Sequence, residues 1–248
     1  MSGHSKWSTI KRKKAVVDAA RGKVFTRIAK ELTIAARAGG GDEATNPRLR
    51  TAISTAKASN MPTANIERAV KKGTGDLEGV IIEEIIYEGY GPGGVALMME
   101  VATDNRNRTV SEIRHLLSKH GGNLAQAGAV GWMFDTKGVV QVPAEGVDED
   151  ELMMAALEGG AEDMSNEGDF FEIVSAPNDL NTVNEAVIEA GYSVEVAQVQ
   201  NIPNNFTDVS AEDLPKVVHL MELLDDHDDM QKLSASVNFT DEMLEGLE

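Results

Sequence analysis

The stretch IEEIIYEGYGPGGVALMMEVA, residues 82–102, decides the fold class of this chain. Residues 82–88 and 94–102 alternate or run apolar, as strands do, and the glycine-rich segment 89–94 between them predicts a hairpin. The segment has no lysine and no following helix, so it is not a phosphate-binding P-loop. Because helices are predicted on both sides of this hairpin, we expect an α+β protein.

Upstream of the hairpin, the sequence predicts three amphipathic helices packed as a small bundle. Apolar side chains recur with a helical period between Phe25 and Ala36, and Gly39–Gly41 end that helix. Asn46 followed by Pro47 marks the start of a second helix. Pro62 opens a third, which stops at Gly73–Gly75.

Downstream, Thr109 and Glu112 have the spacing of a capping box, so we expect a helix to begin at about Thr109. Strands are expected to resume through 132–134. Residues 138–200 then follow the order strand, helix, strand, strand, helix, strand, which is typical of a ferredoxin-like unit. A helix at about 212–225 and a strand at about 232–239 remain to complete the earlier sheet.

Positive charge is confined to one end of the chain. The net charge is -18, yet residues 1–76 hold sixteen Lys and Arg against six Asp and Glu, whereas 77–248 hold seven against thirty-five. A merely solvated surface usually mixes both signs, and a cationic surface gains by binding phosphates and releasing their counterions. We therefore predict a basic nucleic-acid-binding region at 1–76, with a solvated face as the alternative.

The predicted nucleic-acid-binding residues lie in a basic arm and on the outer faces of the three helices. In the arm, Trp7 is expected either to dock on the bundle or to stack on a base. The residues are Lys6, Trp7, Lys11, Arg12, Lys13, Lys14, Arg21, Lys23, Arg27, Lys30, Arg37, Arg48, Arg50, Lys57, Arg68, Lys71 and Lys72.

A secondary contact is considered near the hairpin. Arg106 and Arg108 precede a predicted helix, where they can hold a phosphate or bridge internal carboxylates such as Glu84 or Glu100. Tyr87 and Tyr90 present rings beside the glycines, so a nucleic-acid contact there is a further alternative.

The segment 138–207 carries fifteen Asp and Glu and no Lys or Arg. Phosphate repels such a surface, so we expect it to point away from nucleic acid or to meet a basic protein. Acidity that serves only solubility is the alternative.

Composition argues against several other classes. The chain has no cysteine, so it has no disulfide or thiolate metal site, and no signal peptide is recognised near its start, which favours the cytoplasm.

No convergent nucleophile and base are found, and we predict neither an enzyme nor a cofactor. His227, among Asp225–Asp229, is the best metal candidate, but a solvated acidic helix end is preferred and no metal is predicted. A metal-dependent nuclease using acidic residues of the middle domain is the enzyme alternative.

Several segments resemble the YebC/PmpR family, which includes the mitochondrial translational activator of cytochrome oxidase. They are GHSKW, RGKVFTRIAKEL, GGGDEATNPRLRTAI, YEGYGPGGVALMMEVATDNRNRT and KHGGNLAQAGAVGWMF. The resemblance implies three domains, which we place at 1–77, at 78–137 with 208–248, and at 138–207 as an insertion. It also implies a DNA-binding transcriptional regulator, with a translation factor that binds ribosomal RNA as the alternative.

Overall fold

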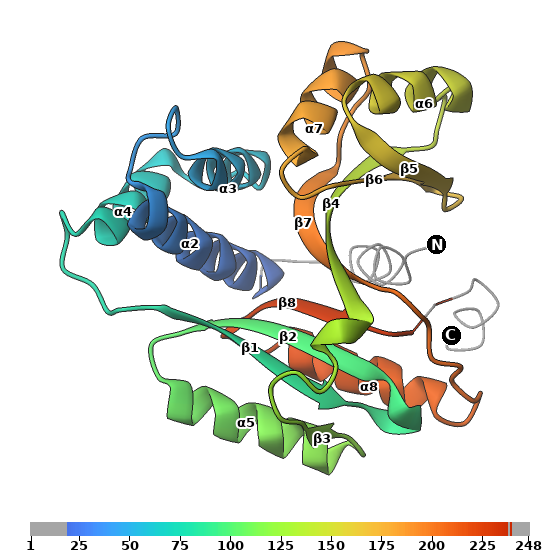
Figure 1. Cartoon of the computed structure of the whole chain (residues 1–248). Helices are drawn as coiled ribbons and strands as arrows, with labels where there is room; N and C mark the ends of the chain where they lie inside the picture. The colour runs from blue at the N-terminus through green and yellow to red at the C-terminus, as the bar shows by residue number, and fades with distance from the viewer. Residues whose placement is uncertain (1–18, 238, 240–248) are drawn as a thin grey trace.

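The computed structural model describes residues 19–237 and 239, and it confirms the predicted α+β class. The described residues form a helical bundle and two four-stranded antiparallel sheets with their own helices (Figure 1). Each of these three units has a separate hydrophobic core. We call them the bundle, the first-sheet unit and the second-sheet unit.

The bundle contains α2 (Ala19–Gly39), α3 (Pro47–Ala58) and α4 (Thr63–Thr74). Local signals set its helix ends as predicted. The side chain of Asn46 accepts a hydrogen bond from the backbone N–H of Leu49 at 3.1 Å, and Gly75 ends α4 with a φ of 85°. Leu32, Leu49 and Ile66 meet in the core of the bundle.

The first sheet has the strand order β3-β1-β2-β8. Its strands are β1 (Glu83–Tyr90), β2 (Ala96–Thr103), β3 (Asn123–Leu124) and β8 (Met230–Ala235). The predicted hairpin is confirmed, since β1 pairs with β2 across a turn in which Gly93 and Gly94 have φ values of 68° and 77°. Helices α5 (Arg106–Lys119) and α8 (Leu214–Asp225) cover one face of this sheet.

The start of α5 differs from the predicted start at Thr109. Asn105 is the N-cap, because its side chain accepts a hydrogen bond from the backbone N–H of Arg108 at 3.1 Å. Thr109 is buried instead, and its hydroxyl donates to Asp229 at 2.7 Å. Asn105 is therefore the cap in place of Thr109, and Thr109 lies one turn inside α5, where its hydroxyl contacts a residue 120 positions away in the sequence.

The second sheet has the order β5-β6-β4-β7 and the ferredoxin-like succession predicted for it. It contains β4 (Phe134–Pro143), α6 (Glu149–Glu158), β5 (Ala161–Asn166), β6 (Phe170–Ser175), α7 (Leu180–Glu189) and β7 (Val196–Pro203). The strand expected through 132–134 begins only at Phe134, because Gly131–Met133 form a short 3-10 helix, η2.

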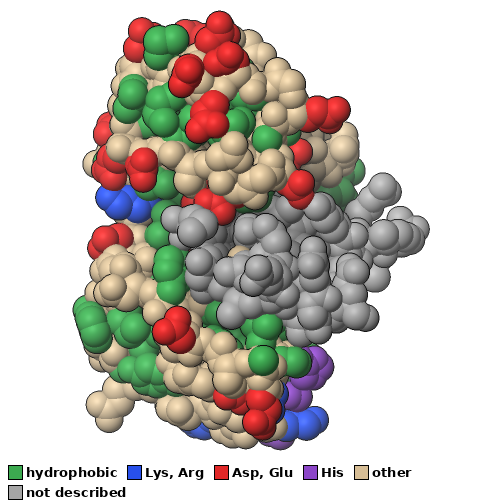
Figure 2. All heavy atoms as spheres, turned by 90° about the vertical axis from the view of Figure 1, so that its right-hand side faces the viewer, with side chains coloured by type: hydrophobic (Ala, Val, Ile, Leu, Met, Phe, Trp, Pro, Cys, Tyr) green, Lys and Arg blue, Asp and Glu red, His purple; other side chains and the backbone are tan. Residues whose placement is uncertain are grey.

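Along the chain, the strands of the second sheet lie between β3 and β8 of the first sheet. The residue limits placed above for the three domains stay predictions. Acidic side chains gather on the second-sheet unit, at the top of the view in Figure 2. Among the described helices, none combines the length and apolarity that crossing a bilayer requires.

Candidate nucleic-acid interface

The charged face of α2 lies against the first-sheet unit. Lys23, Arg27 and Lys30 share one helix face because they are spaced by four and three residues. Their partners are aspartates at and just after the end of α8. The pairs are Lys23–Asp226 at 3.5 Å, Arg27–Asp225 at 3.2 Å and Lys30–Asp229 at 2.8 Å, and we call them the ion-pair cluster. Three cations predicted to bind nucleic acid thus neutralise carboxylates of their own chain.

Asp229 is the buried anchor of the ion-pair cluster, with 3% of its surface exposed. Besides Lys30, it accepts hydrogen bonds from Arg108 at 2.8 Å and from Thr109 at 2.7 Å. Burial alone would raise the pKa of Asp229. The hydrogen bonds from these donors lower the pKa by more than burial raises it, so the pKa lies well below its ordinary value. The predicted solvated acidic helix end is therefore wrong for Asp225 and Asp229, which cations of α2 cover.

Of the two roles predicted for Arg108, binding a phosphate or bridging internal carboxylates, the structure shows the second. Its guanidinium bridges Asp104 at 3.1 Å and Asp229 at 2.8 Å, rather than Glu84 or Glu100. The hydrogen bond to Asp229 raises the pKa of Arg108. Arg106 is exposed and makes no ion pair with any described residue.

Three further cations of the bundle also contact their own chain. Arg48 pairs with Glu31 at 2.7 Å and with Glu84 at 2.5 Å, and these hydrogen bonds raise its pKa. Arg37 donates to the carbonyl of Ile82. Arg50 donates to the backbone carbonyls of Glu43 and Ala44, so it holds the loop before α3.

The cations of α4 differ from those of α2. Arg68, Lys71 and Lys72 are exposed, and within the described part of the chain none of their side chains has an ion-pair or hydrogen-bond partner. The same is true of Lys57 on α3. These four side chains can therefore contact phosphates without first leaving a carboxylate of residues 19–237.

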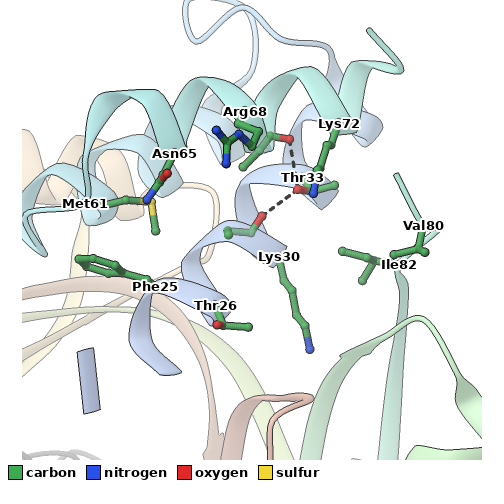
Figure 3. Close-up of a pocket in the computed structure, with 12 residues that line it drawn as sticks. Phe25, Thr26, Lys30, Thr33, Met61, Asn65, Arg68, Lys72, Val80 and Ile82 are labelled. Atoms are coloured by element: carbon green, nitrogen blue, oxygen red, sulfur yellow. Dashed lines mark hydrogen bonds between the residues drawn. The ribbon is translucent and has the colours of Figure 1, made fainter. Parts of the chain in front are cut away.

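A groove of about 360 Å³ lies between α2, α4 and the segment that leads to β1 (Figure 3). We call it the α2–α4 groove. Lys30, Arg68 and Lys72 line it, together with Asn65 and apolar side chains such as Phe25. Its described lining contains no Asp or Glu, although the chain as a whole has a net charge of -18. The groove is therefore an anion-compatible site with a partly apolar floor.

A second cleft, of about 560 Å³, lies where all three units meet, and its charge is mixed. Its cations are Arg27, Arg48 and Lys232, and its carboxylates are Glu31, Glu84 and Glu100. Burial raises the pKa of Glu100, although Lys232 opposes the shift. Arg27 and Arg48 already pair with carboxylates of the chain. This cleft is therefore less suited to binding a phosphate than the α2–α4 groove is.

Comparison with known proteins gives the family. Residues 5–76 match the TACO1/YebC protein N-terminal domain, and residues 82–237 match the TACO1/YebC second and third domain. The chain belongs to the TACO1/YebC family. The bundle thus falls in the N-terminal domain of the family, and both sheets fall in the second match.

Relatives within the TACO1/YebC family cover the whole chain. A protein of Desulforapulum autotrophicum is 53% identical over 100% of both chains, and one of Dictyoglomus turgidum is 50% identical over the same share. Both are named probable transcriptional regulatory proteins. The crystal structure of a conserved hypothetical protein from Aquifex aeolicus, 46% identical, superposes with a TM-score of 0.86 over 93% of this chain and 96% of that one.

Some of the predicted site residues of this TACO1/YebC protein lie outside the described residues. These are Lys6, Trp7, Lys11, Arg12, Lys13 and Lys14, and the side chain of Arg21. For them the assignment to a nucleic-acid-binding arm stays a prediction.

The two tyrosines near the hairpin contact the protein interior. Tyr87 is packed in the core of the first-sheet unit with 9% of its surface exposed. Tyr90 is half-buried, and its hydroxyl donates to the carbonyl of Ala129 at 3.3 Å. The ring of Tyr87 therefore has little exposed surface for stacking on a base.

Glu112, His227 and Asp229 are brought within 4.8 Å of one another, which is a metal-like grouping. However, both oxygens of Asp229 already accept hydrogen bonds, and His227 contacts Glu112 at 3.0 Å. The imidazole Nδ1 also accepts the backbone N–H of Asp229. The group is internally satisfied as it stands, and we assign it no metal.

Two features of the site were missed in the sequence. The partners of the α2 cations at Asp225–Asp229 lie about 200 residues away, and no local pattern connects such segments. In the α2–α4 groove, the sequence did not mark Phe25 or Asn65 as binding residues. An aromatic residue such as Phe25 on the apolar face of an amphipathic helix is ordinarily assigned to the core.

Proposed function

We propose that this protein is a non-enzymatic, cytoplasmic regulator of gene expression that binds nucleic acid through its bundle, as a DNA-binding transcriptional regulator. The observation that supports this is the row of cations on α4 that have no partner among the described residues, next to a groove whose described lining holds no carboxylate, in a strongly acidic chain. Positive charge gathered on one surface is the electrostatic footprint of a nucleic-acid-binding protein. The names of the relatives agree with a regulatory role.

Phosphate contacts dominate in this proposal. Base edges in the major groove are read chiefly by Arg, Asn and Gln, and α2 and α3 contain neither Asn nor Gln. Asn65 on α4 is the one such amide in the three helices. Phosphate contacts position a protein without reading sequence, so we expect weak sequence preference.

A second candidate follows from the same observation. A protein that contacts mainly phosphates suits a structured RNA as well as a duplex operator. Translation regulation at ribosomal RNA is therefore the alternative within the nucleic-acid-binding class. In either case the acidic second-sheet unit is repelled by phosphate, and a basic protein is the partner that suits it.

Removal of the α4 cations tests the proposal. We expect the double variant Arg68→Gln and Lys72→Gln to bind DNA or RNA oligonucleotides more weakly than the unmodified protein. The slope of log K against log salt should become shallower by about 0.9 for each duplex phosphate that the variant no longer neutralises. Fluorescence anisotropy across a salt series measures both quantities.

The matched control is Arg114→Gln with Lys119→Gln, which removes the same charge from exposed positions of α5. It should leave the slope unchanged. Equal losses in both double variants, or no salt-dependent binding by the full-length chain, would contradict the proposal.

Crosslinking in cells, followed by sequencing of bound DNA and bound RNA, then separates transcription from translation. Enrichment on ribosomal RNA without promoter signal decides for the alternative.

A further inference from the structure

The α2–α4 groove has more features than phosphate binding alone requires. Phe25 of α2 and Met61, just before α4, lie at one end, and Val80 and Ile82 lie at the other (Figure 3). Ala29 and Ala69 complete an apolar floor between them. A protein that contacts only the outside of a duplex needs cations, but it does not need such a floor.

Apart from the hydroxyls of Thr26 and Thr33, which donate to backbone carbonyls of α2, the polar side chains of the groove are of two kinds. Asn65 is exposed at the edge, where within the described residues its side-chain amide has no hydrogen-bond partner. Arg68 and Lys72 extend from the same helix, one and two turns further on. The ammonium group of Lys30 is held by Asp229, so Arg68 and Lys72 are the cations available for an anion here.

A ligand that matches this arrangement needs a flat apolar face, a hydrogen-bonding edge and a negative charge. A nucleotide combines all three, since its base stacks on aromatic side chains, its edge pairs with an amide, and its phosphate contacts Arg or Lys. In a duplex the base faces are covered by neighbouring bases, so only an unpaired nucleotide can present them. The volume of about 360 Å³ lies near the lower limit of small-ligand sites, about 300 Å³, which suits one nucleotide.

We propose that the α2–α4 groove binds one unpaired nucleotide of a single-stranded or locally opened nucleic acid, with its base against Phe25 and its phosphate at Arg68 and Lys72. This rests on the proposed function and makes it more specific. The protein then distinguishes single strands from duplexes through the groove, whereas the exposed cations contact either form.

Two substitutions test the groove without removing charge. Phe25→Leu takes away the ring but keeps an apolar side chain in the bundle, and Asn65→Ala takes away an exposed amide. We expect Phe25→Leu to lower the affinity for a single-stranded 12-mer about tenfold, since stacking of one base on an aromatic side chain contributes about that much or more. Asn65→Ala should cause a smaller loss. The affinity for the duplex of the same sequence should change little in both variants.

Matched controls are Phe206→Leu and Asn107→Ala, which make the same changes at exposed positions outside the groove. Thermal unfolding of each variant, followed by circular dichroism, shows whether the fold is kept. An equal loss for single strand and duplex in a folded Phe25→Leu variant overturns the inference and leaves the proposed function standing. Absence of salt-dependent binding to either form by the unmodified chain would instead contradict the proposed function itself.

A direct test uses a single strand that carries 5-iodouridine, which crosslinks to nearby aromatic side chains on irradiation. We expect the crosslink on the tryptic peptide of residues 24–27, which contains Phe25, and its loss in Phe25→Leu. An acidic, leucine-containing peptide serves as the competing probe for a protein partner. If that peptide binds in a Phe25-dependent way while the single strand does not, the groove is a protein-binding site and the inference is wrong.

Discussion

Glu88 shows how a single buried side chain holds a loop of this protein in place. Its carboxylate accepts hydrogen bonds from the backbone N–H groups of Gly128 at 2.7 Å, Val130 at 2.6 Å and Gly131 at 2.8 Å. Burial raises the pKa of Glu88, but the three amides outweigh this effect and lower it below its ordinary value of 4.5. The stabilisation is therefore complete above about pH 4.5 and is lost as the pH falls through the lowered pKa.

We expect Glu88→Gln to lower the free energy of unfolding at pH 7 by about 1–3 kcal/mol, because one oxygen becomes an NH₂ group that cannot accept these amides. The variant should also lose less stability than the unmodified protein when the pH is lowered from 7 to 3. Urea unfolding at several pH values measures the difference. The control Glu83→Gln, an exposed position in the same strand, should behave like the unmodified protein, and a similar loss there would contradict this account.

At the scale of elements, the packing of α4 on α2 depends on Gly73. A Cβ atom at this position would lie 2.4 Å from the carbonyl oxygen of Thr33 and 2.7 Å from the Cβ of Ala36. Alanine favours a helix by about 1 kcal/mol over glycine, but overpacking costs about 1–3 kcal/mol. We expect Gly73→Ala to lower the urea midpoint. Gly22→Ala in α2, where no heavy atom of the described residues lies within 4 Å of the added Cβ, should not lower it, and a lowered midpoint there would contradict the packing explanation.

The helices also show which structural features follow from sequence alone. Asn46, Pro47 and Gly75 act on their own backbone neighbours, so the start of α3 and the end of α4 were predicted correctly. The start of α5 was predicted wrongly because Asn105 is its cap, whereas Thr109 lies one turn inside the helix and donates to Asp229. Capping-box spacing alone therefore did not locate this helix end, although Asn105 is itself a local signal.

At the scale of the whole molecule, the segregation of charge was visible in the sequence, but its geometry was not. A helical wheel places the α2 cations opposite the bundle core and predicts them free for nucleic acid. The structure pairs them with Asp225–Asp229, because the first-sheet unit approaches that face. The α4 cations face no such neighbour among the described residues. Which basic face stays open therefore depends on how the units dock, and no periodicity contains that information.

The ion-pair cluster leads to a final prediction about the whole chain. Asp225→Asn with Asp226→Asn removes the carboxylates that pair with Arg27 and Lys23 and leaves these cations only the backbone carbonyls of the same two residues, so their charge becomes available to phosphates. We expect tighter oligonucleotide binding at low salt, with a slope of log K against log salt steeper by up to about 1.8, which is about 0.9 for each of two further phosphates neutralised. The matched control, Glu158→Gln with Glu189→Gln, removes the same charge from exposed positions at the ends of α6 and α7. If both double variants steepen the slope equally, net charge explains the effect and the ion-pair cluster does not compete with nucleic acid. A steeper slope in the aspartate variant alone, together with a larger radius of gyration by small-angle X-ray scattering, means that the cluster both holds the bundle on the first-sheet unit and withholds two cations from the ligand.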